Sequence, residues 1–227
     1  MIDIEAWLRE LDEEEDVDIK NNEEYQTKLF EEYVLRGTNH AEERRKLNKR
    51  YREGEPVMGE HGLRKELAAF DLSYFGRAYL PHYFIRKSPH FHEELDEIWE
   101  KGVMKDLNPT KEARTISRMK GSRNVTAAPR GHAKSTNFTF KDDLHAILYG
   151  YKHYIIILSD SSEQAEGFLE DIKTELEENA NIIMDFGSLK GDKAWRSGVI
   201  LTSTNIKVEA IGSGKKVRGR RHRNWRP

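Results

Sequence analysis

The sequence predicts an α/β fold in which a mostly parallel sheet is flanked by helices, because two strand–loop–helix units follow each other along the chain. In the first unit, the β-branched stretch 124–127 leads through a tight loop into a helix over 134–149. In the second, the apolar run 154–158 (YIIIL) is typical of a parallel strand covered on both faces. Residues 159–162 (SDSS) are helix-capping types, and a helix over 163–178 follows them. This order is that of a doubly wound α/β domain.

The first 60 residues are expected to form an acidic and charged helical appendage. Residues 1–11 and 25–34 carry apolar side chains at helical spacing, whereas 40–52 is so rich in charge that it predicts a solvated helix or a linker arm. The α/β domain then spans residues 61–227. The boundary is indicated by Gly54, Pro56, Gly59 and Gly62.

Residues 63–99 are dense in aromatic and aliphatic side chains. Their spacing predicts a helix ending near Phe75, an irregular segment around Pro81, and a second helix over 89–99. The rings precede the first loop in the sequence, so they either stack on a nucleotide base or fill the core beneath the sheet.

Composition narrows the class of protein. The chain has 227 residues, no cysteine and a formal net charge of −2, so disulfides and thiolate metal sites are excluded. His82, His90 and His92 have no acidic residues at matching spacing, and we expect them to be exposed or hydrogen-bonded rather than metal-bound. The sequence has neither a signal peptide nor an apolar run long enough to span a bilayer, which predicts a soluble, cytosolic protein.

The charges are segregated along the chain. Asp and Glu dominate residues 3–32, whereas the segment 215–226 carries seven Lys and Arg residues and no acid. This separation of charge favours an anionic partner at the basic segment 215–226. Just before this segment, 195–201 and 206–211 have the pattern of two strands joined in a hairpin at 202–205.

The stretch 124–136 (NVTAAPRGHAKST) has the order that a phosphate-binding loop requires, with Lys134 at the start of a helix. Ala128 and Ala133 stand where the pattern G-x-x-x-x-G-K-[ST] has glycines. Alanine fits there only where φ is negative or where the backbone still clears the phosphates. The alternative is an ordinary strand-to-helix turn with a solvated lysine. The predicted cradle comprises Pro129, Arg130, Gly131, His132, Ala133, Lys134, Ser135 and Thr136.

Phosphoryl transfer from ATP would give each part of this loop a role. Lys134 is expected to contact the β- and γ-phosphates, and Ser135 to be the ligand of the Mg²⁺ held by ATP, with Thr136 beside it. Arg130 either reaches the γ-phosphate or is a surface residue. A second magnesium-binding acid is required at a strand end. Asp160 follows the strand YIIILS, but its neighbours favour a helix cap.

Four motifs in this order resemble the large subunit of the terminases of tailed phages and prophages, the family that packages double-stranded DNA into procapsids. They are the aromatic segment FGRAYLPHYFIRKSPHFHEEL, the loop PRGHAKST, the strand and cap YIIILSDSSEQA, and the basic segment GSGKKVRGRRHRNWRP. The similarity covers residues 63–227, which is most of the chain.

The resemblance implies a P-loop ATPase of the additional-strand type. Such a protein uses ATP and Mg²⁺ and acts as a homo-oligomeric ring on double-stranded DNA in the host cytoplasm, with the portal protein and the small terminase subunit as partners. The family's loop commonly carries an internal arginine, which corresponds to Arg130, and its V-R-G segment makes Arg218 the candidate arginine finger. With Lys134, these are the candidate catalytic residues. Arg220, Arg221 and Arg223 either contact DNA phosphates or serve solubility only.

The family pattern continues past the point where this sequence stops. Relatives proceed from the R-P dipeptide into an apolar strand that ends in two acids, and then into a nuclease domain. We therefore expect nucleotide binding with little or no turnover, no DNA cleavage, and an open sheet edge. Two other classes stay open, a different P-loop ATPase of helicase-like type and a non-enzymatic basic DNA-binding or assembly module.

Overall fold

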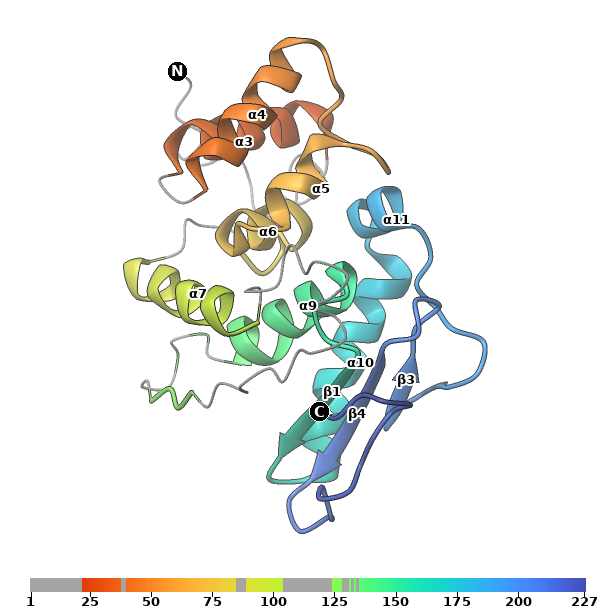
Figure 1. Ribbon diagram of the computed structural model, residues 1–227. Coiled ribbons are helices and arrows are strands. Elements are labelled where there is room, and N and C mark those ends of the chain that lie inside the picture. The colour runs from red at the N-terminus through yellow and green to blue at the C-terminus, as the bar shows by residue number, and fades with distance from the viewer. Residues whose placement is uncertain are drawn as a thin grey trace.

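The computed structural model describes residues 22–37, 40–84, 89–103, 124–127, 131, 133 and 135–227, and side chains are described for these except 101–103. Helices from the first two thirds of the chain lie at one end, and a small sheet lies at the other (Figure 1). Buried apolar side chains from Tyr25 to Ala210 form one continuous core. In the described ranges, no helix has both the length and the apolar character needed to cross a bilayer.

The first two described helices are α3 (Glu23–Arg36) and α4 (Ala41–Arg52). Helix α3 was predicted, whereas for α4 the sequence left a solvated helix or a linker arm open, and the helix is observed. Helix α3 begins after Asn22, whose side chain accepts hydrogen bonds from the amides of Glu24 (2.7 Å) and Tyr25 (3.1 Å). Its apolar stripe is buried, and α4 packs against it while most of the α4 side chains face solvent. The predicted helix at 1–11 lies outside the described residues.

The aromatic region forms two short helices where the sequence predicted one through Phe75. These are α5 (Leu63–Ala68) and α6 (Leu72–Tyr79). The break has a local cause, because the Asp71 side chain accepts from the amide of Tyr74 at 2.8 Å and so begins a new helix. Phe75 and Tyr79 are fully buried, which places both rings in the core.

The next helices are α7 (His90–Val103), the π-helix η1 (Ser135–Asp142) and α9 (Asp143–Tyr149). The helix predicted over 134–149 is therefore present, but its first half is wound as a π-helix. Gly150 ends it with a φ of 71°, a left-handed value at which glycine avoids the Cβ clash of other residues.

Four strands form the sheet in the order β1-β4-β3-β2. They are β1 (Tyr154–Ser159), β2 (Trp195–Arg196), β3 (Val199–Leu201) and β4 (Lys207–Gly212). The pair β1–β4 is parallel, whereas β2–β3 and β3–β4 are antiparallel. The mixed α/β class is confirmed. The predicted mostly parallel sheet is wrong, because the last three strands are joined by short connections that allow only antiparallel pairing.

The hairpin predicted at 202–205 is confirmed, but the single strand predicted over 195–201 is divided into β2 and β3, which pair antiparallel. The amide of Thr202 donates to the carbonyl of Ile206 at 2.9 Å, and the Thr202 hydroxyl accepts from the amide of Ile206 at 3.0 Å. Asn205 adopts a φ of 68° within this turn. Asparagine tolerates that conformation better than most residues, so the turn residues themselves set the register of β3 against β4.

The strand predicted at 124–127 is absent. These four residues lie outside the sheet and are exposed, and the Val125 side chain is 97% exposed. Val125 is the one large apolar residue among them, so the stretch has little apolar surface to bury by joining a sheet. In β1, Ile155 and Ile157 are buried on one face, and on the other face Tyr154 is buried whereas Leu158 is 60% exposed. The prediction that both faces of this strand are covered is therefore wrong only at its carboxyl end.

Helices α10 (Ser162–Glu178) and α11 (Ala180–Phe186) connect β1 to β2. Helix α10 was predicted and packs on β1, β4 and η1. Its cap is Ser161, whose hydroxyl accepts from the amide of Gln164 at 3.1 Å. Asp160, the residue favoured as a cap from the sequence, is exposed and does not fill that position.

A buried ionic contact joins the helical end of the molecule to α11. The guanidinium of Arg64 in α5 bonds to both carboxylate oxygens of Asp185 at 2.8 Å, and neither side chain is exposed. Asn181 accepts a further bond from Arg64 at 2.9 Å, and the Tyr79 hydroxyl donates to Asp185 at 2.5 Å. This network satisfies the charges that the core would otherwise bury unpaired.

Candidate functional site

The loop before η1 contains two residues with left-handed backbone. Gly131 has a φ of 81° and Ala133 a φ of 50°, and both are exposed. The first of the two conditions that the sequence set for alanine, a negative φ, is therefore not met at Ala133, which adopts a conformation usual for glycine. Left-handed residues in a turn direct backbone amides toward one side, as in anion-binding loops. Strained residues of this kind gather at functional sites.

The helix that follows the loop begins at Ser135, one residue after the start predicted at Lys134. Ser135 is exposed and Thr136 is half-buried. The amide and the side-chain amide of Asn137 both donate to the carbonyl of Ala133, at 2.9 and 3.1 Å, and this holds the end of the loop against the first helical turn. Amides at a helix start face outward and carry partial positive charge, so an anion is stabilised there.

The other predicted cradle residues lie outside the described part of the chain. They are Pro129, Arg130, His132 and Lys134. The predictions that Lys134 and Arg130 reach phosphate oxygens therefore stay predictions.

A buried polar cluster lies beneath this loop, between α7 and η1. Lys141 is 1% exposed and its ammonium is 2.5 Å from the carboxylate of Asp96 and 3.8 Å from that of Asp142. Burial raises the pKa of both carboxyl groups, Asp142 more strongly than Asp96. Asn137, 2% exposed, lies 3.4 Å from a ring nitrogen of His92. These contacts fix η1, and with it the loop, against α7.

Sequence reasoning missed this cluster. A signal was present, because Asn137, Lys141, Leu144 and Leu148 recur at spacings of three and four and so share a helix face. All four are buried. Asn137 and Lys141 are polar, so a search for apolar residues alone does not detect this stripe.

The carboxyl ends of β1 and β4 meet at one edge of the sheet, because Ser159 pairs with Gly212 in the parallel ladder. The start of α10 comes so close that a Cβ on Gly212 would lie 2.5 Å from the amide of Ser162. The Ser213 hydroxyl donates to the carbonyl of Asp160 at 2.7 Å. This edge is where ligands bind in open α/β sheets, and α10 connects it to η1.

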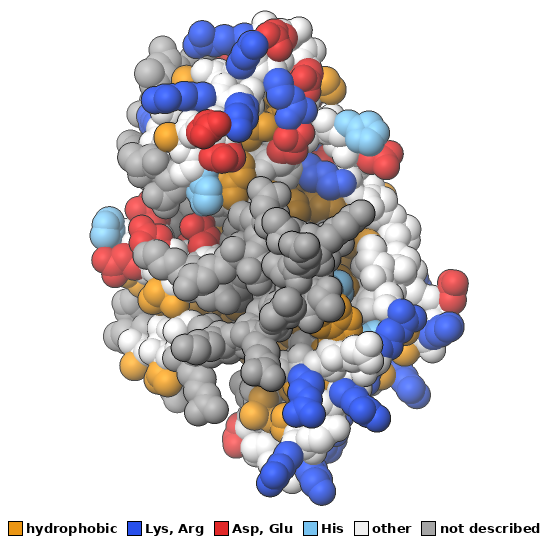
Figure 2. Space-filling model, in the orientation of Figure 1, with side chains coloured by type: hydrophobic (Ala, Val, Ile, Leu, Met, Phe, Trp, Pro, Cys, Tyr) orange, Lys and Arg blue, Asp and Glu red, His pale blue; other side chains and the backbone are white. Residues whose placement is uncertain are grey.

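The basic segment begins at the same edge and then folds back over the sheet. Arg220 contacts Glu209 of β4 at 3.1 Å. His222 lies 3.2 Å from the carbonyl of Asn205, and the Trp225 ring packs 4.2 Å from His153. Arg220 is thus engaged within the chain, whereas Arg218, Arg221 and Arg223 are exposed. Lys and Arg side chains gather at this end of the molecule (Figure 2).

The three histidines are exposed or hydrogen-bonded, which is the state that the sequence predicted. His82 bonds to Glu175 at 2.7 Å, His92 lies against Asn137, and His90 is exposed beside Glu94 at 3.3 Å. Within the described ranges, no group of three or more His, Asp or Glu side chains is placed to hold a metal ion.

The protein is thus a mixed α/β protein with a turn of left-handed residues directly before the helix formed by η1 and α9. The buried side chain of Lys141 ties this helix to α7. Comparison of the chain with protein-family models, with curated proteins and with solved structures gave no match.

Proposed function

We propose that this chain is the ATP-binding portion of the large subunit of a phage or prophage terminase, the ATPase that packages double-stranded DNA. The observation that carries the proposal is the loop that precedes η1. In the sequence PRGHAKST, Gly131 and Ala133 have positive φ and the helix begins directly after Lys134. A phosphate chain requires this combination of curved backbone, helix start and cationic side chain.

In the proposed complex with ATP and Mg²⁺, each part of the loop has a separate role. The amides of the cradle bind the phosphate oxygens, Lys134 neutralises the β- and γ-phosphates, and Arg130 approaches the γ-phosphate. The exposed hydroxyl of Ser135 is free to coordinate the Mg²⁺ that ATP carries. The fold assignment that goes with this function is a P-loop ATPase of the additional-strand type.

The partners follow from the same resemblance. Double-stranded DNA would be held by phosphate contacts from the basic segment, to which exposed Arg221 and Arg223 are better suited than paired Arg220. Arg218, exposed on the turn after β4, would act on the nucleotide of a neighbouring subunit in a homo-oligomeric ring. The portal protein and the small terminase subunit would be the other components of the DNA-packaging complex in the host cytoplasm.

Nucleotide binding tests the proposal directly. We expect the full chain to bind a fluorescent ATP analogue in the presence of Mg²⁺, and Lys134→Ala to weaken binding by about tenfold or more because a charge-assisted contact is lost. Lys193→Ala is the matched control, since Lys193 is an exposed lysine near β2. Equal affinity in wild type and Lys134→Ala would count against the loop as a phosphate site.

A non-enzymatic DNA-binding module is the second candidate, favoured by the exposed arginines of the basic segment. The same set of proteins separates the two functions. If DNA binding falls with salt and survives Lys134→Ala while no nucleotide binds, the basic segment alone is the working part.

A further inference from the structure

The basic segment, residues 215–226, carries an exposed aromatic ring among its cations. Trp225 is 49% exposed, and within 212–227, all of which the structure describes, it is the only exposed large apolar side chain. Of the seven cations of the segment, only Arg220 has its charge paired among the described residues, with Glu209. The other six are exposed, and they are Lys215, Lys216, Arg218, Arg221, Arg223 and Arg226.

The Trp225 ring is held in place by its own chain. His222 and Trp225 exchange both backbone hydrogen bonds, at 3.0 and 2.8 Å, and so close a tight turn with Arg223 and Asn224 at its tip. Arg223 adopts a φ of 50°, a left-handed value that is uncommon for arginine. The indole packs on the His153 ring at a centroid distance of 4.2 Å. The exposed part of the indole is therefore presented to solvent in a fixed orientation, beside free cations.

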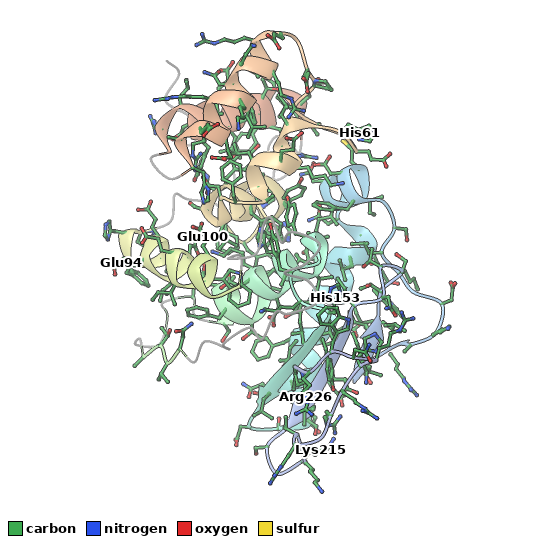
Figure 3. The ribbon with its side chains drawn as sticks, in the orientation of Figure 1. His61, Glu94, Glu100, His153, Lys215 and Arg226 are labelled. Carbon is green, nitrogen blue, oxygen red and sulfur yellow. The ribbon has the colours of Figure 1, made fainter. Side chains whose placement is uncertain are left out.

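The acids of the helical end lie away from this surface. Glu94 and Glu100 mark α7 at one side of the molecule, whereas Lys215 and Arg226 lie beside the sheet (Figure 3). The surface around Trp225 therefore favours an anionic partner.

We propose that this surface binds single-stranded DNA, with Trp225 stacked on an unpaired base and the exposed arginines on the neighbouring phosphates. Aromatic rings beside backbone-binding cations are the usual means of binding a single strand without sequence preference, because every base has a flat π-face. In a duplex those faces are covered by the stacked neighbours, and a side chain enters only at the cost of unstacking. The choice of DNA rests on the proposed function, which assigns phosphate contacts but no base contact to this segment.

An acidic protein surface is the competing partner, because guanidinium groups also bind carboxylates. The centre of a protein interface contains several apolar or aromatic side chains that are buried together. Trp225 is instead a single exposed ring surrounded by cations. One ring suffices to stack on a base, so the arrangement favours a nucleic acid strand.

Fluorescence anisotropy of a labelled oligodeoxythymidylate of about 15 nucleotides, titrated with the full chain at low salt, tests the surface. We expect saturable binding that weakens with salt, and Trp225→Ala to weaken it by about tenfold or more because a base–ring stack is lost. Trp225→Phe should keep most of the affinity. Tyr83→Ala is the matched control, since Tyr83 is 47% exposed and lies outside the basic segment. Absence of binding, or equal affinity in wild type and Trp225→Ala, would overturn the proposal.

An abasic strand separates stacking from a purely structural role of Trp225. A strand of the same length with sugars and phosphates but no bases should bind the wild type about tenfold more weakly than the oligodeoxythymidylate. Trp225→Ala should change the affinity for the abasic strand by less than about twofold, because the phosphate contacts remain. If Trp225→Ala weakens the binding of both strands equally, the ring only holds the segment against His153, and the proposal is wrong.

A duplex of the same length and polyglutamate complete the comparison. We expect Trp225→Ala to leave the affinity for the duplex unchanged, since its contacts are to phosphates. A loss on the duplex or on polyglutamate as large as that on the single strand would contradict base stacking. No nucleoside triphosphate is present in these titrations. Failure of the phosphate loop, measured with Lys134→Ala, is therefore distinguishable from failure of this surface.

Discussion

Ala133 shows how one residue carries information that a pattern search would discard. Its methyl group breaks the glycine pattern of a phosphate-binding loop, yet the backbone adopts the left-handed conformation for which glycine is usually selected. We expect this strain to be compatible with folding and to change the free energy of unfolding by a measurable amount.

Substitution at Ala133 tests that strain. Ala133→Gly should stabilise the chain by about 0.5–1 kcal/mol, because relief of the left-handed strain exceeds the added entropy of glycine in the unfolded state. Ala133→Val should destabilise it by about 1 kcal/mol or more, because a β-branched residue is poorly tolerated there. Urea unfolding measures both, with Ala127→Val, at an exposed site without positive φ, as the control. If Ala133→Val instead stabilised the chain, the φ angle at residue 133 would have to be negative.

At the scale of elements, the helix after the loop depends on buried polar groups. Lys141, Asp142 and Asn137 are buried in η1. Helix α7 supplies the partners of Lys141 and Asn137, which are Asp96 and His92, whereas Asp142 lies beside Lys141 of η1 itself. π-helical turns are rare and often occur at functional sites, where the wider turn displaces side chains from the positions that an α-helix gives them.

Asp143, at the junction of η1 and α9, makes the stability of this element depend on pH. Burial raises its pKa to about 8, far above the usual carboxyl value of about 3.9. The folded chain then holds a proton that the unfolded chain releases, so the contribution of this group to stability is full below about pH 4 and is lost as the pH rises toward 8.

Asp143→Asn should therefore be more stable than the wild type at pH 8, and the difference should shrink as the pH falls to 4. Thermal or urea unfolding across this range measures it, with the exposed Asp192→Asn as control. A difference that stays constant with pH, or that grows on acidification, would show that Asp143 titrates normally in the folded chain.

At the scale of the whole molecule, one buried ion pair connects the helical end to the segment that leads into the hairpin. Arg64 and Asp185 are separated by 121 residues in the sequence and are both fully buried. The Tyr79 hydroxyl and the amide of Gly59 also donate to Asp185, at 2.5 and 2.8 Å. Removing one member of a buried ion pair strongly lowers the free energy of unfolding, because the charge of the other member stays buried without a partner.

Asp185→Ala should lower the free energy of unfolding by about 3–5 kcal/mol, because it leaves the Arg64 charge uncompensated. Glu177→Gln is the comparison, since it removes an exposed pair with Lys190 and should cost about 1 kcal/mol or less. Chemical denaturation measures both variants. Similar losses in the two would mean that Arg64 finds water or another acceptor.

Short-range features were predictable because their causes are local. The strand β1, the helix α10 with its polar start, the end of α9 at Gly150 and the hairpin at 202–205 each follow from residues within a few positions. The Asp71 cap that splits the aromatic helix was missed, although it too is local. The cap of α10 was displaced by one residue, to Ser161.

What the sequence alone determined is the mixed α/β class, most of the helices, the hairpin and the unusual loop, because backbone preferences and apolar spacing act over a few residues. Only the tertiary structure decided that 124–127 stays outside the sheet, that β1 pairs with β4, and that Lys141 and Arg64 are buried with partners 45 and 121 residues away. Those outcomes depend on which surfaces meet, and a buried charge is stable only where a distant partner is brought to it.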